Sequence, residues 1–390
     1  MSSYDICIIG GAGHVGLPLS IAFAEKGQKV MILDINKNAL DTINCGKMPF
    51  LEEGCEEKLK QVIGKKLLTS SDNAIISQAK YVVVIVGTPV DEHLNPTFHN
   101  MKMLFEDILP YLKNEQIIIM RSTVYPGTTE KVRSMLKDKL PNIEVCFCPE
   151  RILEGKSMEE LYNLPQIVSG FNEKAIKEVS ALFNLLTKDI LIVKPMEAEL
   201  AKVFTNTWRY IQFATANQFY MIAEEAGVDF YKVYNAMTFN YPRAKGFPRP
   251  GFAAGPCLFK DTMQTSAFAK NTFFLGHSAM LINEGLPNFV VSQLKEKHDL
   301  TKKTVGILGM AFKSESDDKR ESLSYKLKKI LEIEAKKVFC SDVYIKEEGF
   351  VDEKSLIEKS DIIIIGAPHK KYKKLEYQGK KIIDVWNMIE

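Results

Sequence analysis

Residues 4–36 read YDICIIGGAGHVGLPLSIAFAEKGQKVMILDIN, and this stretch decides the fold class of the chain. It starts with a run of apolar and β-branched residues, passes through a glycine-dense turn, and continues as an amphipathic pattern before a second apolar run. A strand, a tight turn, a helix and a second strand in this order form one βαβ unit. The stretch therefore predicts a parallel α/β sheet.

The turn GAGHVG at residues 11–16 fits the pattern G-x-G-x-x-G. Such glycines let the backbone approach a pyrophosphate that rests on the N-terminus of the following helix. Asp34 ends the next strand, where its carboxylate can accept hydrogen bonds from both ribose hydroxyls and repels a 2′-phosphate. NAD is therefore favoured over NADP, against the alternative of a turn that serves packing alone. The predicted contacts are Gly11, Gly13, Val15, Gly16 and Asp34.

Three segments divide the rest of the chain. Further apolar runs at 81–89, 116–124 and 144–150 alternate with helical patterns, which extends the first sheet over a domain at 1–193. A long helical pattern closed by Gly227 opens a helical middle segment at 194–298. Four Lys-led apolar runs then predict a smaller α/β domain at 299–390, after a linker at 295–303. The fold class is α/β, with two doubly wound Rossmann-like domains joined by a long central helix.

Composition excludes several classes of protein. The 390 residues are 46% hydrophobic and carry a formal net charge of +2, which provides no global field for nucleic acid or an anionic membrane. The longest apolar runs fall far below the roughly 18 residues of a membrane span, and no leader pattern is present, so a cytoplasmic protein is expected. Seven cysteines without a CxxC pair argue against a metal site, and Cys146 and Cys148 are expected in a strand core.

Two positions in the middle segment carry candidate chemistry. Cys257 follows a loop of small residues and precedes Lys260-Asp261, whose cation would favour a nucleophilic thiolate; a buried, inert cysteine is the alternative. Lys202 and Asn206 share one face of the long helix and could stabilise an alkoxide, unless Glu199 and Lys202 form a solvated ion pair.

Two loops at strand ends are candidate ligand sites. In the second α/β domain, Phe312 and Lys313 follow the first strand, where an aromatic face and a cation could hold a nucleotide, or the turn could serve helix packing. Residues 149–155, PERILEG, follow a strand of the first domain, at the edge where ligands bind in open α/β sheets. Their charges are either site residues or ordinary loop charges.

These segments together resemble the UDP-glucose/GDP-mannose dehydrogenase family, whose members oxidise C6 of a nucleotide sugar to the carboxylate with two NAD. The resemblance spans nearly the whole chain. It rests on the segments IIGGAGHVGLPLS, MPFLEEG, VGTP, RSTVYPGTT, CPERILEG, EAELAKVFTN, GPCLFKD, INEGLPNFVV and LGMAFKSESDDKRES.

The resemblance implies a role for each matching residue. Cys257 would be the nucleophile that forms a thiohemiacetal and then a thioester. Lys202 would stabilise the oxyanion with Asn206 as its hydrogen-bonding partner, and Asp261 would work with Lys202 through a water. Thr123 and Glu150 would order the hydrolytic water. Further cofactor contacts are Thr88, Thr123, Glu154, Lys260 and Arg320. Substrate contacts are Arg151, Leu153, Lys202, Asn206, Arg243 from a neighbouring subunit, Gly251, Phe252, Gly255, Cys257, Phe312 and Lys313. A UDP-sugar substrate and a homodimer or higher homo-oligomer follow.

The sugar is the open point. Ala253-Ala254 replaces the usual glycine pair before the nucleophile, and Arg151 follows Glu150 as in enzymes for UDP-N-acetylhexosamines of the ManNAc or GlcNAc type. Lys260-Asp261, in contrast, is in the style of UDP-glucose enzymes that make UDP-glucuronate. Two other functions remain as alternatives: a two-electron 3-hydroxyacid dehydrogenase, and a non-catalytic regulator that binds NAD and a nucleotide sugar.

Overall fold

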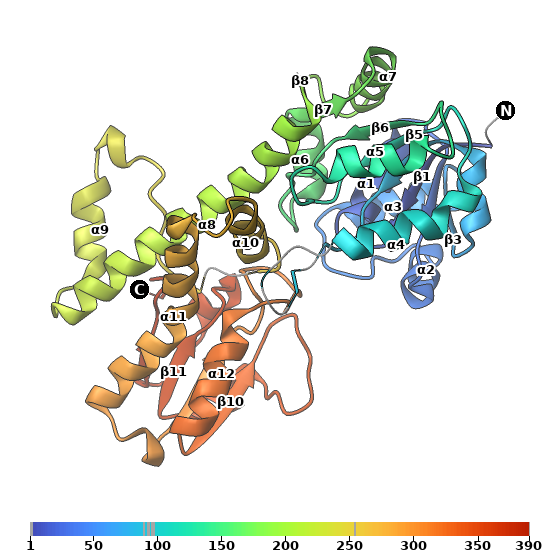
Figure 1. The fold of residues 1–390 in the computed structure, drawn as a ribbon. Coiled ribbons are helices and arrows are strands. Elements are labelled where there is room, and N and C mark those ends of the chain that lie inside the picture. The colour runs from blue at the N-terminus through green and yellow to red at the C-terminus, as the bar shows by residue number, and fades with distance from the viewer. Residues whose placement is uncertain (1–2, 89, 92–93, 95–97, 253–254, 390) are drawn as a thin grey trace. The chain divides into compact units, whose positions relative to one another are not determined.

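The computed structural model describes residues 3–88, 90–91, 94, 98–252 and 255–389, and it divides the chain into two compact units (Figure 1). The first unit is Met1–Thr205 and the second is Asn206–Glu390. Helix α8 (Pro195–Glu225) crosses from one unit to the other. The predicted pair Ala253-Ala254 lies outside the described residues.

The first unit is built on an eight-stranded sheet in the order β3-β2-β1-β4-β5-β6-β7-β8. All neighbours pair in parallel except β6 and β7, which are antiparallel. The sequence predicts five of these strands and misses β3, β7 and β8, of which β3 and β8 form the two edges of the sheet. The bounds are β1 Tyr4–Ile9, β2 Val30–Leu33, β3 Leu67–Ser70, β4 Ala79–Val84, β5 Ile117–Met120, β6 Glu144–Phe147, β7 Gln166–Gly170 and β8 Ile190–Val193.

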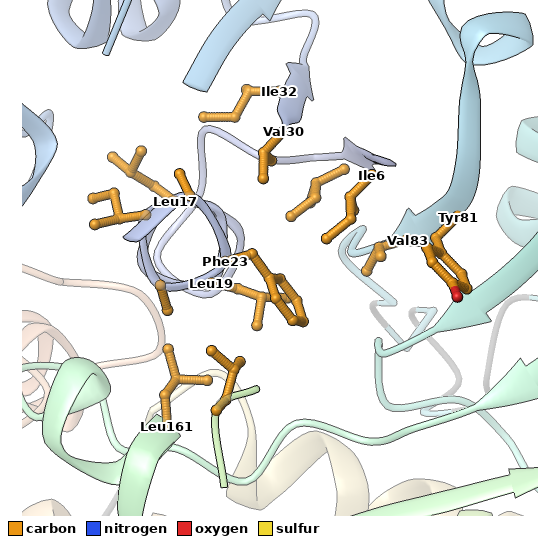
Figure 2. Packing of buried hydrophobic residues seen from close by; sticks show 14 of the residues in the cluster. Ile6, Leu17, Leu19, Phe23, Val30, Ile32, Tyr81, Val83 and Leu161 are labelled. Carbon is orange, nitrogen blue, oxygen red and sulfur yellow. The ribbon is translucent and has the colours of Figure 1, made fainter. Parts of the chain in front are cut away.

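Helices cover both faces of this sheet, because alternate residues of its central strand point to opposite sides. Ile6 of β1 packs near Phe23, as Figure 2 shows, in an apolar cluster that also contains Ile8, while Cys7 and Ile9 pack in another with Phe105. This arrangement confirms the doubly wound prediction. The helices are α1 Gly16–Glu25, α2 Lys37–Asn44, α3 Cys55–Val62, η1 Asn73–Gln78, α4 Phe98–Ile108, η2 Leu109–Tyr111, α5 Thr128–Lys137, α6 Ser157–Asn163 and α7 Glu173–Phe183.

The second unit repeats the central part of that topology with a parallel sheet in the order β10-β9-β11-β12. All four predicted strands are present: β9 Thr304–Leu308, β10 Lys337–Ser341, β11 Ile362–Ile365 and β12 Lys381–Ile383. Its other elements are α9 Phe230–Thr238, η3 Pro242–Ala244, α10 Leu258–Phe268, α11 Phe274–Lys297, η4 Leu300–Lys302, α12 Leu323–Glu334, α13 Glu353–Lys359 and η5 Lys370–Lys374. The order of strands therefore confirms a second Rossmann-like domain.

The long helix ends where the sequence predicts. Gly227 takes φ +70°, its N–H donates to the carbonyl of Glu224, and the N–H of Val228 reaches the carbonyl of Ala223. This left-handed cap suits glycine because it lacks a Cβ. The predicted linker is partly wrong, since α11 continues through Lys297 and leaves a connection of only a few residues before β9. Over the described residues, no helix is both long and apolar enough to cross a bilayer.

Candidate active site

The glycine turn after β1 has room for a ligand at one position. A Cβ on Gly11 would lie 2.7 Å from the carbonyl oxygen of Ile8, and a Cβ on Gly16 would lie 2.5 Å from that of Gly10. A Cβ on Gly13 meets only the oxygen of Gly10, at 3.6 Å, which is an ordinary contact. Packing therefore requires Gly11 and Gly16, whereas Gly13 leaves the backbone accessible.

The sequence did not single out Gly10, which the structure shows to be as constrained as its neighbours. Its φ is +75°, and a Cβ would overlap the carbonyl of Ile85 at 1.8 Å. The sequence does show two consecutive glycines, Gly10 and Gly11, directly after β1. The pattern G-x-G-x-x-G begins at Gly11 and therefore omits Gly10.

Helix α1 and Asp34 frame this turn. Val15 is the N-cap of α1 and makes no side-chain capping hydrogen bond. Asp34 accepts from the N–H of Ala12 at 3.0 Å and from the N–H of Asn36 at 2.9 Å, and it is partly exposed at the end of β2. An anion at the helix N-terminus and a ribose at the carboxylate both suit this geometry.

Replacing Gly13 by alanine tests whether the turn binds a cofactor or only packs. Because the added methyl has room in the protein, the melting temperature should stay within a few degrees of the parent. The Kd for NAD, measured by calorimetry, should rise about tenfold or more, since the methyl lies where the pyrophosphate approaches. Gly16→Ala is the contrasting variant, expected to lower stability through its backbone clash. An unchanged Kd in Gly13→Ala would leave packing as the only function of the turn.

The loops after β4 and β5 are tied together. The hydroxyl of Thr88 donates to the carbonyl of Thr123 at 2.5 Å, and the N–H of Val86 donates to the hydroxyl of Ser122 at 2.7 Å. Both loops lie at the carboxyl edge of the sheet, because β4 and β5 are parallel neighbours. The structure therefore brings together Thr88 and Thr123, which the sequence proposes as cofactor and water contacts.

Glu150 lies in the loop after β6 and is held by nitrogen donors. Its carboxylate pairs with Arg121 and accepts from the N–H of Arg151 at 2.7 Å and of Ile152 at 3.1 Å. Burial raises the pKa of Glu150, but the Arg121 guanidinium and these hydrogen bonds outweigh it and hold the pKa below its ordinary value. The group is therefore ionised at neutral pH and suited to accept a proton.

The neighbouring predicted residues have mixed surroundings. Arg151 donates from Nη2 to the carbonyl of Pro165, a partner that the sequence did not suggest. The side chain of Leu153 is exposed, and its N–H donates to Glu160. Glu154 is partly exposed in the same loop. The contact to Pro165 anchors the side chain of Arg151 to the backbone just before β7.

Two buried carboxylates cap helices that are distant from them in the sequence. The sequence analysis did not predict this structural role. Glu199 of α8 accepts from the N–H groups of Gly127 and Thr129 at the start of α5, at 2.6 and 2.8 Å. Glu52 accepts in the same way from Gly155 and Ser157, at the start of α6. Since Glu199 is only 1% exposed, the alternative of a solvated Glu199–Lys202 pair is wrong.

In the second unit, Cys257 is the N-cap of α10 and is exposed. A helix N-terminus favours negative charge, which suits a thiolate. Cys7, Cys148 and Cys340 differ, because burial raises the pKa of each thiol to about 12. Cys146 and Cys148 are fully buried, as the sequence predicts. The accessible thiol at the helix start is therefore the candidate nucleophile, and the inert alternative does not fit its exposure.

A buried polar group lies one helical turn after Cys257. Asp261 is fully buried, and its two oxygens contact Nζ of Lys260 at 2.8 Å and Nδ2 of Asn206 at 2.6 Å. The N–H of Asp261 donates to the carbonyl of Cys257 at 2.9 Å. Lys202 lies one turn before Asn206 on the same face of α8. Asp261 thus fixes the amide of Asn206 in one orientation.

Gly251, Phe252 and Gly255, which precede Cys257, contact aromatic rings or a buried amide. A Cβ on Gly251 would lie 2.2 Å from the ring of Trp386, and a Cβ on Gly255 would lie 2.6 Å from that of Phe312. The N–H of Gly251 donates to the amide of Asn217, which is itself bonded to Asn283 at 2.9 Å. Phe252 is buried beside Trp386. The sequence analysis did not select Asn217 or Trp386. An amide side chain within a helical pattern of apolar residues is a signal that could have indicated Asn217.

The turn after β9 is organised differently from the first glycine turn. Asp342, at the end of β10, accepts from the N–H groups of Met310 and Ala311 and contacts Nε2 of His369 at 3.2 Å. It occupies the position that Asp34 has in the first unit, but it is almost fully buried. The hydrogen bonds of the Asp342 side chain are therefore made within the protein. The candidate ligand contacts of this turn are Phe312 and Lys313.

Two predicted arginines in the second unit are exposed. Arg320 forms a bidentate pair with Asp318, with Nε to carboxylate distances of 3.0 and 2.9 Å. Arg243, in η3, donates from Nε to the hydroxyl of Tyr241 at 2.7 Å. Each guanidinium contacts a side chain two residues away. Both arginines are exposed, so a ligand or a second chain can reach them.

Comparison of the sequence with known families now decides the assignment. Residues 4–187 match the NAD binding domain of the UDP-glucose/GDP-mannose dehydrogenase family, residues 196–284 its central domain, and residues 306–390 its UDP binding domain.

The chain belongs to this family.

Relatives within the UDP-glucose/GDP-mannose dehydrogenase family extend over nearly the whole chain. It is 30% identical to a UDP-N-acetyl-D-mannosamine dehydrogenase from Pyrococcus horikoshii, covering 97% of this chain and 95% of that protein. It is 31% identical to an enzyme of the same name from Methanocaldococcus jannaschii, covering 97% and 88%. A solved UDP-D-ManNAc dehydrogenase from Pyrococcus horikoshii has a TM-score of 0.92 at 28% identity, covering 99% and 96%.

Membership of the family confirms NAD as the cofactor and a dinucleotide-binding role for the first unit. The residues present fit this group: α1 starts without a side-chain cap from Val15, Gly13 leaves its flank accessible, and Asp34 is oriented by Ala12. The UDP binding domain lies in the second unit, as the prediction for the smaller α/β domain requires.

Proposed function

We propose that this protein oxidises C6 of a UDP-N-acetylhexosamine to the uronic acid, with NAD as acceptor and Cys257 as covalent nucleophile. The observation that carries the proposal is the exposed Cys257 at the start of α10, one turn from the buried Asp261–Asn206 pair. A two-electron dehydrogenase needs no such cysteine. UDP-glucose, giving UDP-glucuronate, is the alternative substrate.

Cys257 accounts for the transfer of four electrons at one site. NAD, when bound, supplies the hydride acceptor for both oxidations. Once C6 is an aldehyde, the thiolate adds to it, forming a C–S bond and moving the carbonyl electron pair onto oxygen as a thiohemiacetal. Loss of hydride from C6 gives a thioester. Water then adds to C6, the C–S bond breaks, and the carboxylic acid leaves with the thiolate restored.

Other residues of the chain handle charge and protons in this scheme. Lys202 and Asn206, one turn apart on α8, stabilise the negative oxygen on C6. One N–H of the Asn206 amide donates to Asp261, which fixes the direction of the other N–H. Glu150, ionised beside Arg121, accepts a proton from the hydrolytic water, which Thr123 helps to order.

Counting NADH per sugar separates this proposal from its two rivals. The proposed enzyme yields two NADH per UDP-sugar consumed, a 3-hydroxyacid-type dehydrogenase yields one, and a binding protein yields none. The absorbance of NADH at completion, against a known amount of sugar, gives the ratio directly.

We expect a UDP-N-acetylhexosamine to be used more efficiently than UDP-glucose. Two relatives bear the name UDP-N-acetyl-D-mannosamine dehydrogenase, and Arg151 offers donors to an acetamido carbonyl. Where the bound sugar buries this contact, a substrate without that group leaves a donor unpaired and loses about 1–3 kcal/mol. A panel of UDP-ManNAc, UDP-GlcNAc, UDP-GalNAc, UDP-glucose and GDP-mannose measures kcat/KM. Arg151→Phe tests the cause, and equal or better efficiency with UDP-glucose would assign the glucose branch.

We further propose a homodimer or a higher homo-oligomer through α8. Trp208, Phe219 and Ile222 are 60%, 40% and 54% exposed, and their spacing places them on one helical face with Ile211 and Thr215. Large apolar side chains gathered on one face mark protein interfaces. Arg243, exposed in η3, is then available for donation to the site of a neighbouring subunit.

Trp208→Arg should dissociate this assembly. A buried tryptophan at an interface typically contributes 2 kcal/mol or more, so the dimer Kd should rise about thirtyfold or more, with activity falling in parallel. Sedimentation velocity at assay concentration gives the oligomeric state. Ile333→Arg is the matched control, because Ile333 is 85% exposed on α12 and its replacement should leave the assembly intact. A fully active monomer would rule out the donated Arg243.

A further inference from the structure

Arg121 is a fully buried cation next to the proposed water-binding residue. It follows β5, and the exposed fraction of its side chain is 0%. Nη1 donates to Oε1 of Gln166 at 3.0 Å, Nη2 donates to the carboxylate of Glu150, and the guanidinium lies 4.9 Å from the ring centre of Phe183. The sequence analysis assigns this arginine no function, and the proposed mechanism names it only as the neighbour of Glu150.

Burial of such a charge is costly unless the protein gains something from it. Nε of Arg121 is buried without a hydrogen-bond partner among the described residues. In this position, one N–H donor of the guanidinium therefore lacks an acceptor among the described residues. The ion-pair partner of Arg121 is the Glu150 carboxylate, which follows the neighbouring strand β6.

The contacts of Glu150 leave one acceptor position for a ligand. Oε1 accepts from the N–H groups of Arg151 and Ile152, and Oε2 accepts from Arg121. A carboxylate has about four lone-pair sites, so one on Oε2 remains. A cavity of about 20 Å³ lies beside Glu150 and Gln166, which is room for one water molecule.

Other charged or titratable groups near Glu150 do not replace Arg121. The Arg151 guanidinium donates to the carbonyl of Pro165, and Glu160, which lines the cavity, accepts from the N–H of Leu153. Burial raises the pKa of Cys148 to about 12, so this thiol is neutral. Arg121 is therefore the cation in contact with Glu150 that can hold it in the ionised state against burial.

We propose that Arg121 is a positioning residue that keeps Glu150 ionised and aims its free lone pair at the water that hydrolyses the thioester. The proposal rests on the proposed function for the role of Glu150. In this step the water oxygen bonds to C6, its proton passes to Glu150, and the C–S bond breaks to restore the Cys257 thiolate. Arg121 itself touches neither the substrate nor the water.

The test is the pH dependence of kcat in Arg121→Gln. Glutamine keeps a donor for Glu150 but removes the charge, so the acid limb should move up by about 1 to 3 pH units. Arg121→Lys restores the charge and should keep the acid limb close to that of the parent. Arg133→Gln is the matched control, because Arg133 also pairs with a glutamate and lies 4.5 Å from an aromatic ring, but its side chain is 32% exposed and its partner is Glu130.

A second measurement does not depend on turnover. Infrared difference spectra at about pH 5 between Arg121→Gln and Arg121→Gln/Glu150→Gln should show a protonated carboxyl, whereas parent against Glu150→Gln at the same pH should show a carboxylate. Folding is checked by NAD binding and thermal melting, with Arg121→Met as the alternative variant if glutamine is not tolerated. An unmoved acid limb and an ionised Glu150 in a folded variant would overturn the proposal. Failure of the NADH count with the expected infrared result would overturn only the proposed function.

Discussion

Replacing Cys257 by serine is expected to lower overall turnover about a thousandfold or more, because the reaction loses its covalent intermediate. A serine hydroxyl is far less acidic than a thiol, and its ester releases the acid slowly. The Kd for NAD should be unchanged, because the glycine turn lies in the first unit and Cys257 in the second. Steady-state NADH formation with the preferred UDP-sugar measures the loss.

Two companion variants make this result specific. Cys45→Ser removes the other exposed cysteine and should leave turnover unchanged. Cys257→Ala should still reduce an added UDP-sugar 6-aldehyde with NADH, because that half-reaction needs hydride transfer but no thiolate. Full four-electron turnover by Cys257→Ser would rule out the thioester mechanism.

Asp34 is expected to make the enzyme prefer NAD over NADP by roughly 10- to 1000-fold in kcat/KM. A 2′-phosphate would face the carboxylate and would also displace the hydrogen bonds from the ribose hydroxyls. The preference should be strong because Asp34 is held in place by the N–H groups of Ala12 and Asn36. Initial rates with both cofactors at saturating sugar give the ratio.

Asp34→Asn should reduce this preference about tenfold or more by removing the charge while keeping an acceptor oxygen. Asp5→Asn is the matched control, since Asp5 also accepts from a backbone N–H, that of Lys29, at the opposite end of β1. It should keep the parental ratio. Comparable efficiency with NADP in the unmodified enzyme would refute the role of Asp34.

Several properties could be predicted from the sequence because their causes are local. Gly13 and Asp34 lie at fixed offsets from a strand–turn–helix pattern, and Gly227 follows the last turn of a helix, so spacing alone indicates them. The four strands of the second sheet are continuous apolar runs, which indicate buried parallel strands by themselves. Cys257 was recognisable from its loop and its neighbours, although its exposure was not.

The last two strands of the first sheet were harder to predict for a physical reason. β8 lies at the edge of the sheet, and β7 pairs antiparallel with β6 in a sheet that is otherwise parallel. Short apolar runs fit a strand or a helix equally well, and the direction of pairing depends on the connection. Tertiary packing therefore determined the strands at this edge of the sheet and the direction in which they pair.

The sequence by itself determined the two Rossmann-like units, the NAD-binding turn and the candidate nucleophile, because each depends on residues close together in the chain. Tertiary structure alone decided which buried charges meet. Arg121 reaches Glu150 across 29 positions, and Glu199 caps α5 across 70. Contacts between distant residues leave no fixed spacing in a single sequence, whereas burial forces each charge to find a partner once the chain has folded.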